Sequence, residues 1–173
     1  MAEPVRQYSW LQENLYSKNV ARDREFQRRF NHFYRVRYPQ CWQKYFFGML
    51  ERHKNKTPRL EFKDALRQLY QNTGRLEASF ASKLVATIDT QRPVIDRHLL
   101  KHANLRLPWY GAVDREAKIV DLYRSLTQWI SELRHSECGH KAVAGFTERF
   151  PPAGISETKI LDLIFWQMRD PCC

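Results

Sequence analysis

The stretch that decides the fold is residues 114–134, DREAKIVDLYRSLTQWISELR. Its apolar residues recur at spacings of three and four, at Ile119, Leu122, Leu126, Ile130 and Leu133. Residues at these spacings share one face of an α-helix, because the helix has 3.6 residues per turn. The sequence therefore predicts a long amphipathic helix here, with this face turned toward a core.

The same periodicity recurs in most segments between glycine and proline breakers. It predicts further helices over residues 22–36, from 39 to about 52, from about 59 to 72, and over 77–88, 94–103, 141–150 and 157–168. Gly74 is expected to end the helix before it, Ser156 to cap the last helix, and residues 138–140 to form a turn. No segment shows the alternation of a β-strand, and the six glycines are too few for the tight turns of an all-β fold. We therefore expect an all-α, compact single domain of about eight helices spanning residues 1–173, with residues 1–20 as an N-terminal arm.

Composition supports a folded protein. The chain has 173 residues, 43% of them hydrophobic, which is enough to bury a core without a metal or disulfide. No apolar run approaches the roughly 20 residues that span a bilayer, and the first residues do not resemble a secretory signal. The cysteines (Cys41, Cys138, Cys172 and Cys173) form no paired framework. These features predict free thiols, no contact with a membrane and a cytoplasmic location.

The chain is strongly basic, with 29 lysines and arginines against 19 acidic residues and a net charge of +10. A surplus of this size attracts polyanions and speeds their association. Nucleic acid is therefore the expected partner. A basic surface that only keeps the protein soluble, or that binds a protein partner, is the alternative.

One basic face is visible within the helix predicted over residues 22–36. Phe26, Phe30 and Phe33 mark its apolar side. At 100° per residue, Arg24, Arg28 and Arg35 fall together on the opposite side, where they would suit a row of phosphates. The alternative interpretation is an ordinary solvated helix face.

Several classes of protein are not indicated by the sequence. His135, Cys138 and His140 lie close together but lack the paired spacing of a zinc site, so we expect neither a metal nor another cofactor. No glycine-rich phosphate loop and no Gly-x-Ser-x-Gly motif occurs. The hydrolases that use those motifs are therefore excluded.

Residues 69–108 carry the most specific pattern. They read as a helix, a short turn containing Gly74, a second helix, a loop, and then Ile95-Asp96-Arg97-His98-Leu99 followed by Lys101. This segment resembles the helix-hairpin-helix DNA glycosylases, in which a glycine-containing hairpin leads into a helix, a short loop and an apolar-Asp-x-His-apolar motif. The resemblance implies a glycosylase-like helical core, double-stranded DNA as the partner, and excision of a base from that DNA.

The resemblance also assigns roles to individual residues. Asp96 matches the catalytic aspartate, which stabilises positive charge on the sugar as the base leaves. Ser79, or Ala78, matches the position of the Schiff-base lysine, and a serine there is similar to the monofunctional glycosylases. Lys83 lies one helical turn further on, where we expect it to point elsewhere. Phosphate contacts are expected from Arg75, Arg97, His98 and Lys101.

The hairpin departs from the family pattern and leaves alternatives open. It has one glycine, Gly74, where the family has two, and Glu77 stands where backbone amides would face phosphate. Asp96 is also well placed as the N-cap of the following helix, with or without a catalytic role. A glycosylase-like module that binds nucleic acid or protein without catalysis is therefore the alternative function.

An aromatic pair follows Pro108. Trp109 and Tyr110 are the best candidates for stacking on a nucleic-acid base, and packing within the protein is the alternative. His98 and His102 lie four residues apart, on one helix face, where we expect them to extend a basic surface.

Overall fold

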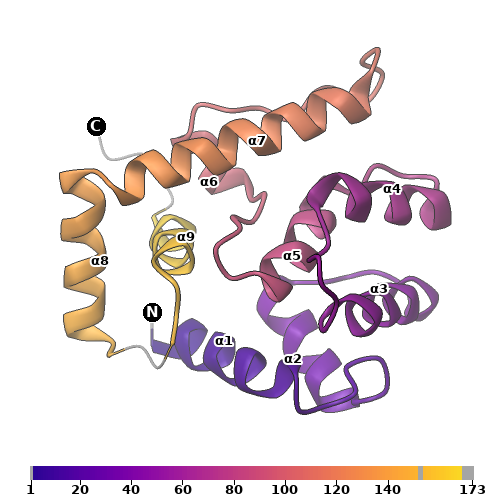
Figure 1. Ribbon diagram of the computed structural model, residues 1–173, viewed down its shortest axis with the longest axis horizontal. Helices are drawn as coiled ribbons and strands as arrows, with labels where there is room; N and C mark the ends of the chain where they lie inside the picture. The colour runs from indigo at the N-terminus through magenta and orange to yellow at the C-terminus, as the bar shows by residue number, and fades with distance from the viewer. Residues whose placement is uncertain (1, 152–153, 169–173) are drawn as a thin grey trace. The chain divides into compact units, whose positions relative to one another are not determined.

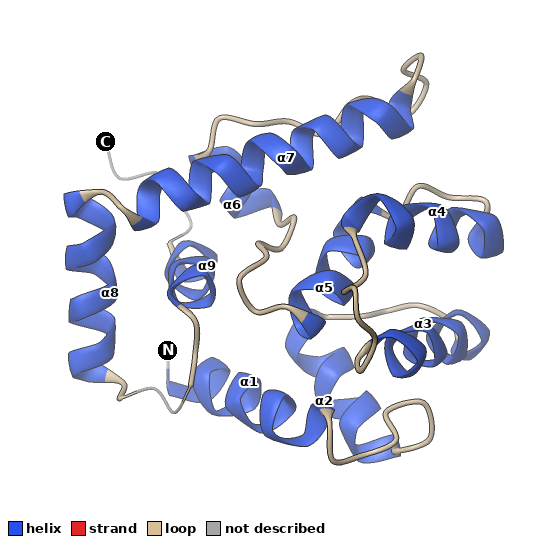
Figure 2. Ribbon diagram, viewed as in Figure 1, coloured by secondary structure: helices blue, strands red, loops and turns tan. Residues whose placement is uncertain are grey.

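The computed structural model describes residues 2–151 and 154–168, and within them it contains nine helices and no strand (Figures 1 and 2). The all-α prediction is therefore confirmed. The helices are α1 (Ala2–Leu15), α2 (Arg24–Tyr34), α3 (Gln40–His53), α4 (Phe62–Thr73), α5 (Ala78–Ile88), α6 (Arg97–His102), α7 (Arg115–Arg134), α8 (Glu137–Arg149) and α9 (Glu157–Gln167).

The helices fall into two compact units, residues 1–60 with α1 to α3 and residues 61–173 with α4 to α9. We call them the N-terminal and C-terminal units and describe each by itself. The single domain that the sequence indicates stays a prediction.

The N-terminal unit is built on an aromatic cluster from α2 and α3. Phe26, Phe30, Phe46 and Phe47 are all at most 1% exposed. The ring centroid of Phe30 lies 5.5 Å from that of Phe46 and 5.3 Å from that of Phe47, within the range of favourable ring contacts. This cluster holds the apolar face of α2 inward and leaves its basic face outward.

The helix that the sequence does not predict is α1, which occupies most of the expected N-terminal arm. It packs against α2 and buries Val5, Tyr8, Leu11 and Leu15. These residues lie three and four positions apart, the spacing of one helix face. Residues 2–15 therefore belong to the folded part of the N-terminal unit.

The C-terminal unit contains the helix pair α4 and α5, which pack against each other, and α9, which contacts α6, α7 and α8 (Figure 1). The predicted apolar stripe of α7 is confirmed at Ile119, Leu122, Leu126 and Ile130, which are buried, whereas Leu133 at the end of the helix is only half-buried. The apolar residues of α9 are buried as well: residues 160, 161 and 163 are at most 2% exposed.

Local signals set several helix ends. Gly74 ends α4 in the left-handed conformation (φ 66°), and its N–H donates to the carbonyl of Tyr70. Ser156 caps α9 by accepting the N–H of Lys159, and its hydroxyl donates to the carbonyl of Thr90. Asp23 caps α2 in the same way, through the N–H of Phe26 at 2.7 Å.

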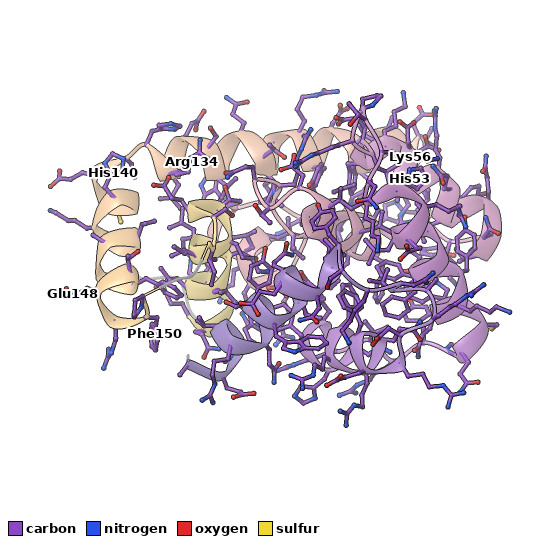
Figure 3. All side chains as sticks on the ribbon, turned by 60° about the horizontal axis from the view of Figure 1, so that its bottom comes forward. His53, Lys56, Arg134, His140, Glu148 and Phe150 are labelled. Atoms are coloured by element: carbon purple, nitrogen blue, oxygen red, sulfur yellow. The ribbon has the colours of Figure 1, made fainter. Side chains whose placement is uncertain are left out.

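One predicted turn is helical instead. The triplet 138–140 lies inside the first turns of α8, which begins directly after the cap Ser136, and His140 lies on that helix (Figure 3). The hydroxyl of Ser136 accepts the N–H of Gly139 at 3.0 Å. A Cβ at Gly139 would lie 1.9 Å from the carbonyl oxygen of Leu133, so glycine is required here for close approach rather than for a turn.

Among the described residues, no helix combines the length and the apolar character needed to cross a membrane.

Candidate nucleic-acid interface

The basic face of α2 is fixed by its two ends and its buried side. Arg24 and Arg28 are exposed on the side opposite Phe26 and Phe30. The helix ends at Tyr34, and Arg35 takes the left-handed conformation (φ 53°). Because Arg35 lies beyond the last regular turn, the helical spacing that places it with the other two arginines no longer applies.

A basic hollow of about 850 Å³ lies in the N-terminal unit between α2 and the start of α3. Four cationic side chains and no carboxylate line it. Its lining residues are Ala21, Arg22, Arg24, Gln27, Arg28, Asn31, Gln40, Cys41, Gln43 and Lys44. We call this site the α2–α3 hollow; it includes two of the three predicted α2 arginines and does not include Arg35.

The four cations of the α2–α3 hollow are not used by the fold. None of Arg22, Arg24, Arg28 and Lys44 forms a side-chain ion pair or hydrogen bond with a residue that the structure describes. Arg29, on the same helix but outside the hollow, differs: it pairs with Glu25 at 2.8 Å and lies over the ring of Trp10. The cations in the hollow are therefore available to an external anion.

The frame of the hollow is held by amide side chains. The amide nitrogen of Asn31 donates to Oε1 of Gln43 at 2.6 Å and so links α2 to α3. Gln43 in turn donates to the carbonyl of Tyr38 at 2.6 Å. These bonds position the first turn of α3, which has no side-chain cap, against the arginines. The positive end of the α3 dipole thus adds to the field of the cations.

The charge of the whole chain is concentrated in this unit. Residues 1–60 hold 13 of the 29 basic residues and five of the 19 acidic ones, which gives them +8 of the net charge of +10. The C-terminal unit is close to neutral. The electrostatic attraction for a polyanion is therefore a property of the N-terminal unit rather than of the hairpin segment.

In the hairpin segment, Asp96 is the N-cap of α6. Its Oδ1 accepts the N–H of His98 at 2.7 Å, and the side chain is half-buried. Two amides of the 74–77 turn region are also satisfied locally: Arg75 donates to the hydroxyl of Thr73, and Ala78 to the carbonyl of Leu76. Exposed Arg75 remains on the surface of the turn.

The expectation that Lys83 points elsewhere is wrong: Lys83 and Ser79 are four residues apart on α5 and share one helix face. The Lys83 ammonium group donates to the hydroxyl of Ser79 at 2.5 Å, and that hydroxyl donates to the carbonyl of Ile95 at 2.9 Å. Burial of the ammonium group lowers the pKa of Lys83 to about 8, although the nearby charges of Asp96 and Asp162 favour its protonated form. Ser79, Lys83 and Asp96 thus form one electrostatically coupled group.

This lowered pKa makes stability depend on pH. Unfolding returns the pKa of Lys83 from about 8 to about 10.5, so between these values the unfolded chain binds more protons. We expect the free energy of unfolding to rise by about 1 kcal/mol per pH unit between pH 8 and 9.5. Lys83→Met should lose this rise, as measured by urea unfolding at each pH.

The interval from pH 8 to 9.5 lies below the pH at which a second buried group, Tyr123, affects stability. Burial raises the pKa of Tyr123 above its ordinary value, so its effect has the opposite sign: stability is lost as pH rises above about 10. Parallel pH profiles of the parent and Lys83→Met below pH 9.5 would show that Lys83 is protonated in the folded protein throughout.

A second, smaller hollow lies beside α6 and contains two of the predicted phosphate contacts. Its volume is about 300 Å³, and its cations are Arg97, Lys101 and Arg106, again without a carboxylate. His98 does not line it, and the Nε of Arg97 donates to the His98 ring at 3.3 Å. We call this site the α6 hollow.

The remaining predicted site residues are separate from both hollows. Trp109 and Tyr110 are each 74% exposed, so neither ring is packed in the core. The ring centroid of His102 lies 4.6 Å from that of Phe165. No group of three or more metal-ligating side chains occurs in the described residues, and Cys172 and Cys173 lie outside them.

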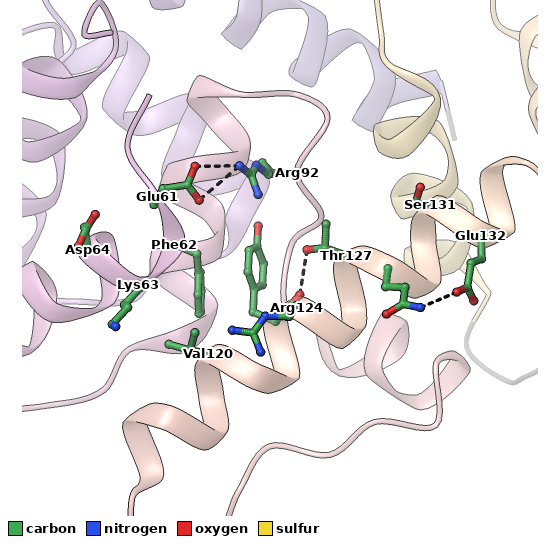
Figure 4. A pocket seen from close by; sticks show the side chains of 12 residues that line it. Glu61, Phe62, Lys63, Asp64, Arg92, Val120, Arg124, Thr127, Ser131 and Glu132 are labelled. Atoms are coloured by element: carbon green, nitrogen blue, oxygen red, sulfur yellow. Dashed lines mark hydrogen bonds and ion pairs between the residues drawn. The ribbon is translucent and has the colours of Figure 1, made fainter. Parts of the chain in front are cut away.

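A third pocket, of about 750 Å³, lies between the α4 and α7 regions and differs in character (Figure 4). Its wall carries the stacked rings of Phe62 and Tyr123, with centroids 3.8 Å apart. Arg92 is held there by Glu61 at 3.0 Å, and further acidic and basic residues balance each other. This mixed pocket has no excess charge to attract a polyanion.

Comparisons with protein-family models, curated proteins and solved structures give no match. Lys44 is the cation of the α2–α3 hollow that sequence reasoning missed. Lys44 stands on a different helix, and only the packing of α3 against α2 brings it to the arginines.

Proposed function

We propose that this protein binds nucleic acid, as duplex DNA, through the α2–α3 hollow. The observation that carries the proposal is the set of four cations without a carboxylate or an internal partner, in a unit that holds +8 of the chain's charge. Arginine suits this role because its planar guanidinium donates two parallel hydrogen bonds to phosphate. We also propose the cytoplasmic location that the sequence predicts.

The binding is expected to be electrostatic and largely independent of sequence. Phosphate contacts position a protein on the duplex, whereas base contacts give specificity. If each of the four cations neutralises one phosphate, the logarithm of the binding constant falls with the logarithm of the salt concentration with a slope of about −3.6.

Arginine modification tests the location of the interface. We expect bound duplex to protect Arg22, Arg24 and Arg28 from phenylglyoxal, measured by mass spectrometry of the digested protein. Arg6 and Arg124, each with a side chain 74% exposed, should be modified equally with and without DNA. Protection of the last two, with none at the first three, would place the interface elsewhere.

A second proposal is base excision assisted by Asp96, as the glycosylase resemblance implies. It is supported by the coupled group of Ser79, Lys83 and Asp96, where a carboxylate lies in the field of a buried amine. The cap on α6 accounts for Asp96 without catalysis, which favours the binding module.

Asp96→Asn separates these two proposals. Asparagine is as good an N-cap as aspartate, so the variant should keep α6 and its fold. If the protein excises bases, its single-turnover cleavage of damaged duplex should fall at least about 100-fold, because the carboxylate charge is lost. Equal cleavage by the parent and Asp96→Asn would remove Asp96 from the mechanism.

A further inference from the structure

The loop between α6 and α7 concentrates the exposed apolar surface of the protein. Of six large hydrophobic side chains exposed in the described residues, four are in this loop. They are Leu107, Trp109, Tyr110 and Val113, which are 41% to 76% exposed. Contiguous exposed apolar groups of this kind mark binding surfaces.

The geometry of the loop fixes its largest ring. A Cβ placed on Gly111 would lie 2.4 Å from the ring of Trp109, so the indole rests against the backbone at this glycine. Arg115 supports the same segment: its Nε donates to the carbonyl of Pro108 at 3.4 Å, and its guanidinium lies 5.0 Å from the centroid of the Tyr110 ring. Trp109 is thus a positioned and open aromatic surface.

The α6 hollow adjoins this surface along the chain. Arg106 and Leu107 line the hollow. Trp109 follows Leu107 by two residues, so the Cα atoms of Leu107 and Trp109 are at most about 7 Å apart. The hollow brings the cations of Arg97, Lys101 and Arg106 together without a carboxylate. An aromatic surface beside a cationic hollow can bind a base and the phosphate attached to it.

We propose that the 105–113 loop and the α6 hollow form a binding site for single-stranded nucleic acid. An unpaired base stacks on Trp109, and the adjoining phosphate binds to Arg97, Lys101 and Arg106. The site extends the proposed function, on which it rests for the class of its ligand, but it uses residues that the α2–α3 hollow does not contain.

Single-stranded nucleic acid fits these features better than the alternatives. The faces of bases within a duplex are covered by their neighbours, so an aromatic surface reaches only unpaired bases. A bilayer would take up the apolar side chains as well. The concave α6 hollow, however, gathers its three cations around a space suited to a single phosphate.

The test compares binding of labelled oligothymidylate and labelled duplex to the full chain by fluorescence anisotropy. Trp109→Ala should weaken oligothymidylate binding about 10-fold, and Trp109→Phe should restore most of it, because stacking needs only an aromatic ring. Gly111→Val should cause a similar loss, since its side chain displaces the indole. Duplex binding should change less than 2-fold.

Tyr70→Ala is the matched control, since Tyr70 is an exposed aromatic residue on α4, outside this loop. It should leave binding of both probes unchanged. Equal binding of oligothymidylate by Trp109→Ala and the parent would overturn the proposal. So would a Trp109-dependent affinity for phosphatidylserine vesicles in place of oligothymidylate, which would identify the loop as a bilayer contact.

The two binding proposals fail separately in this design. If Trp109→Ala did not weaken oligothymidylate binding while the parent bound duplex, the single-strand site alone would be overturned. A Trp109-dependent affinity for oligothymidylate in a protein that does not bind duplex would support the single-strand site and overturn the function proposed for the α2–α3 hollow.

Discussion

Replacing Arg24 and Arg28 together by glutamate is expected to weaken duplex binding about 100-fold. Each arginine that contacts phosphate contributes roughly 1.5–3 kcal/mol through charge-assisted hydrogen bonds, and two such losses correspond to at least this factor. The new carboxylates also repel the DNA. The salt slope should fall by about 2, because two phosphates lose their counter-charge. Anisotropy titrations of labelled duplex measure both quantities.

Lys56→Glu with Arg59→Glu is the matched control. It changes the net charge of the same unit by the same amount but lies beyond the end of α3 at His53, opposite the end that lines the hollow (Figure 3). Lys44 and His53 alone are separated by about 14 Å of helix. If both double variants weakened binding equally, the overall charge rather than the α2–α3 hollow would account for it.

The second large effect concerns stability. Asp162→Ala is expected to lower the free energy of unfolding by about 3–5 kcal/mol. Asp162 forms an ion pair with Lys159 on α9, and the two residues are only 7% and 6% exposed. Loss of the carboxylate leaves a buried ammonium group with a missing counter-charge. Urea unfolding followed by circular dichroism gives the change.

Two further variants isolate the cause. Lys159→Met with Asp162→Leu should recover much of the lost stability, because apolar groups can replace a buried ion pair. Asp121→Ala should change stability by less than about 1 kcal/mol, since its ion pair with Arg124 is exposed. A loss from Asp162→Ala no larger than that from Asp121→Ala would show that the α9 pair is hydrated in the folded protein.

Much of the fold follows from local sequence signals. The α7 stripe, the glycine that ends α4 and the serine that caps α9 each depend on residues close in sequence, and each is found as predicted. The α1 helix was missed although its buried residues have helical spacing. The Ser136 cap was missed because glycine at position 139 suggests a turn.

The candidate interface is only partly predictable, for reasons of packing. Helical spacing alone places Arg24 and Arg28 on one face of α2. It fails for Arg35, because the helix ends one residue earlier in a left-handed cap. The contribution of Lys44 depends on how α3 packs against α2. The contact of Lys83 with Ser79 was missed although their spacing of four residues places both on one face of α5.

The most direct test of the central claim is the anisotropy of labelled duplex DNA with the unaltered protein across a salt series. Neutralisation of four phosphates predicts measurable binding at 50 mM salt and an affinity roughly 100-fold lower at 200 mM. Absence of binding at 50 mM salt, or an affinity that does not change between the two concentrations, would contradict an electrostatic interface at the α2–α3 hollow.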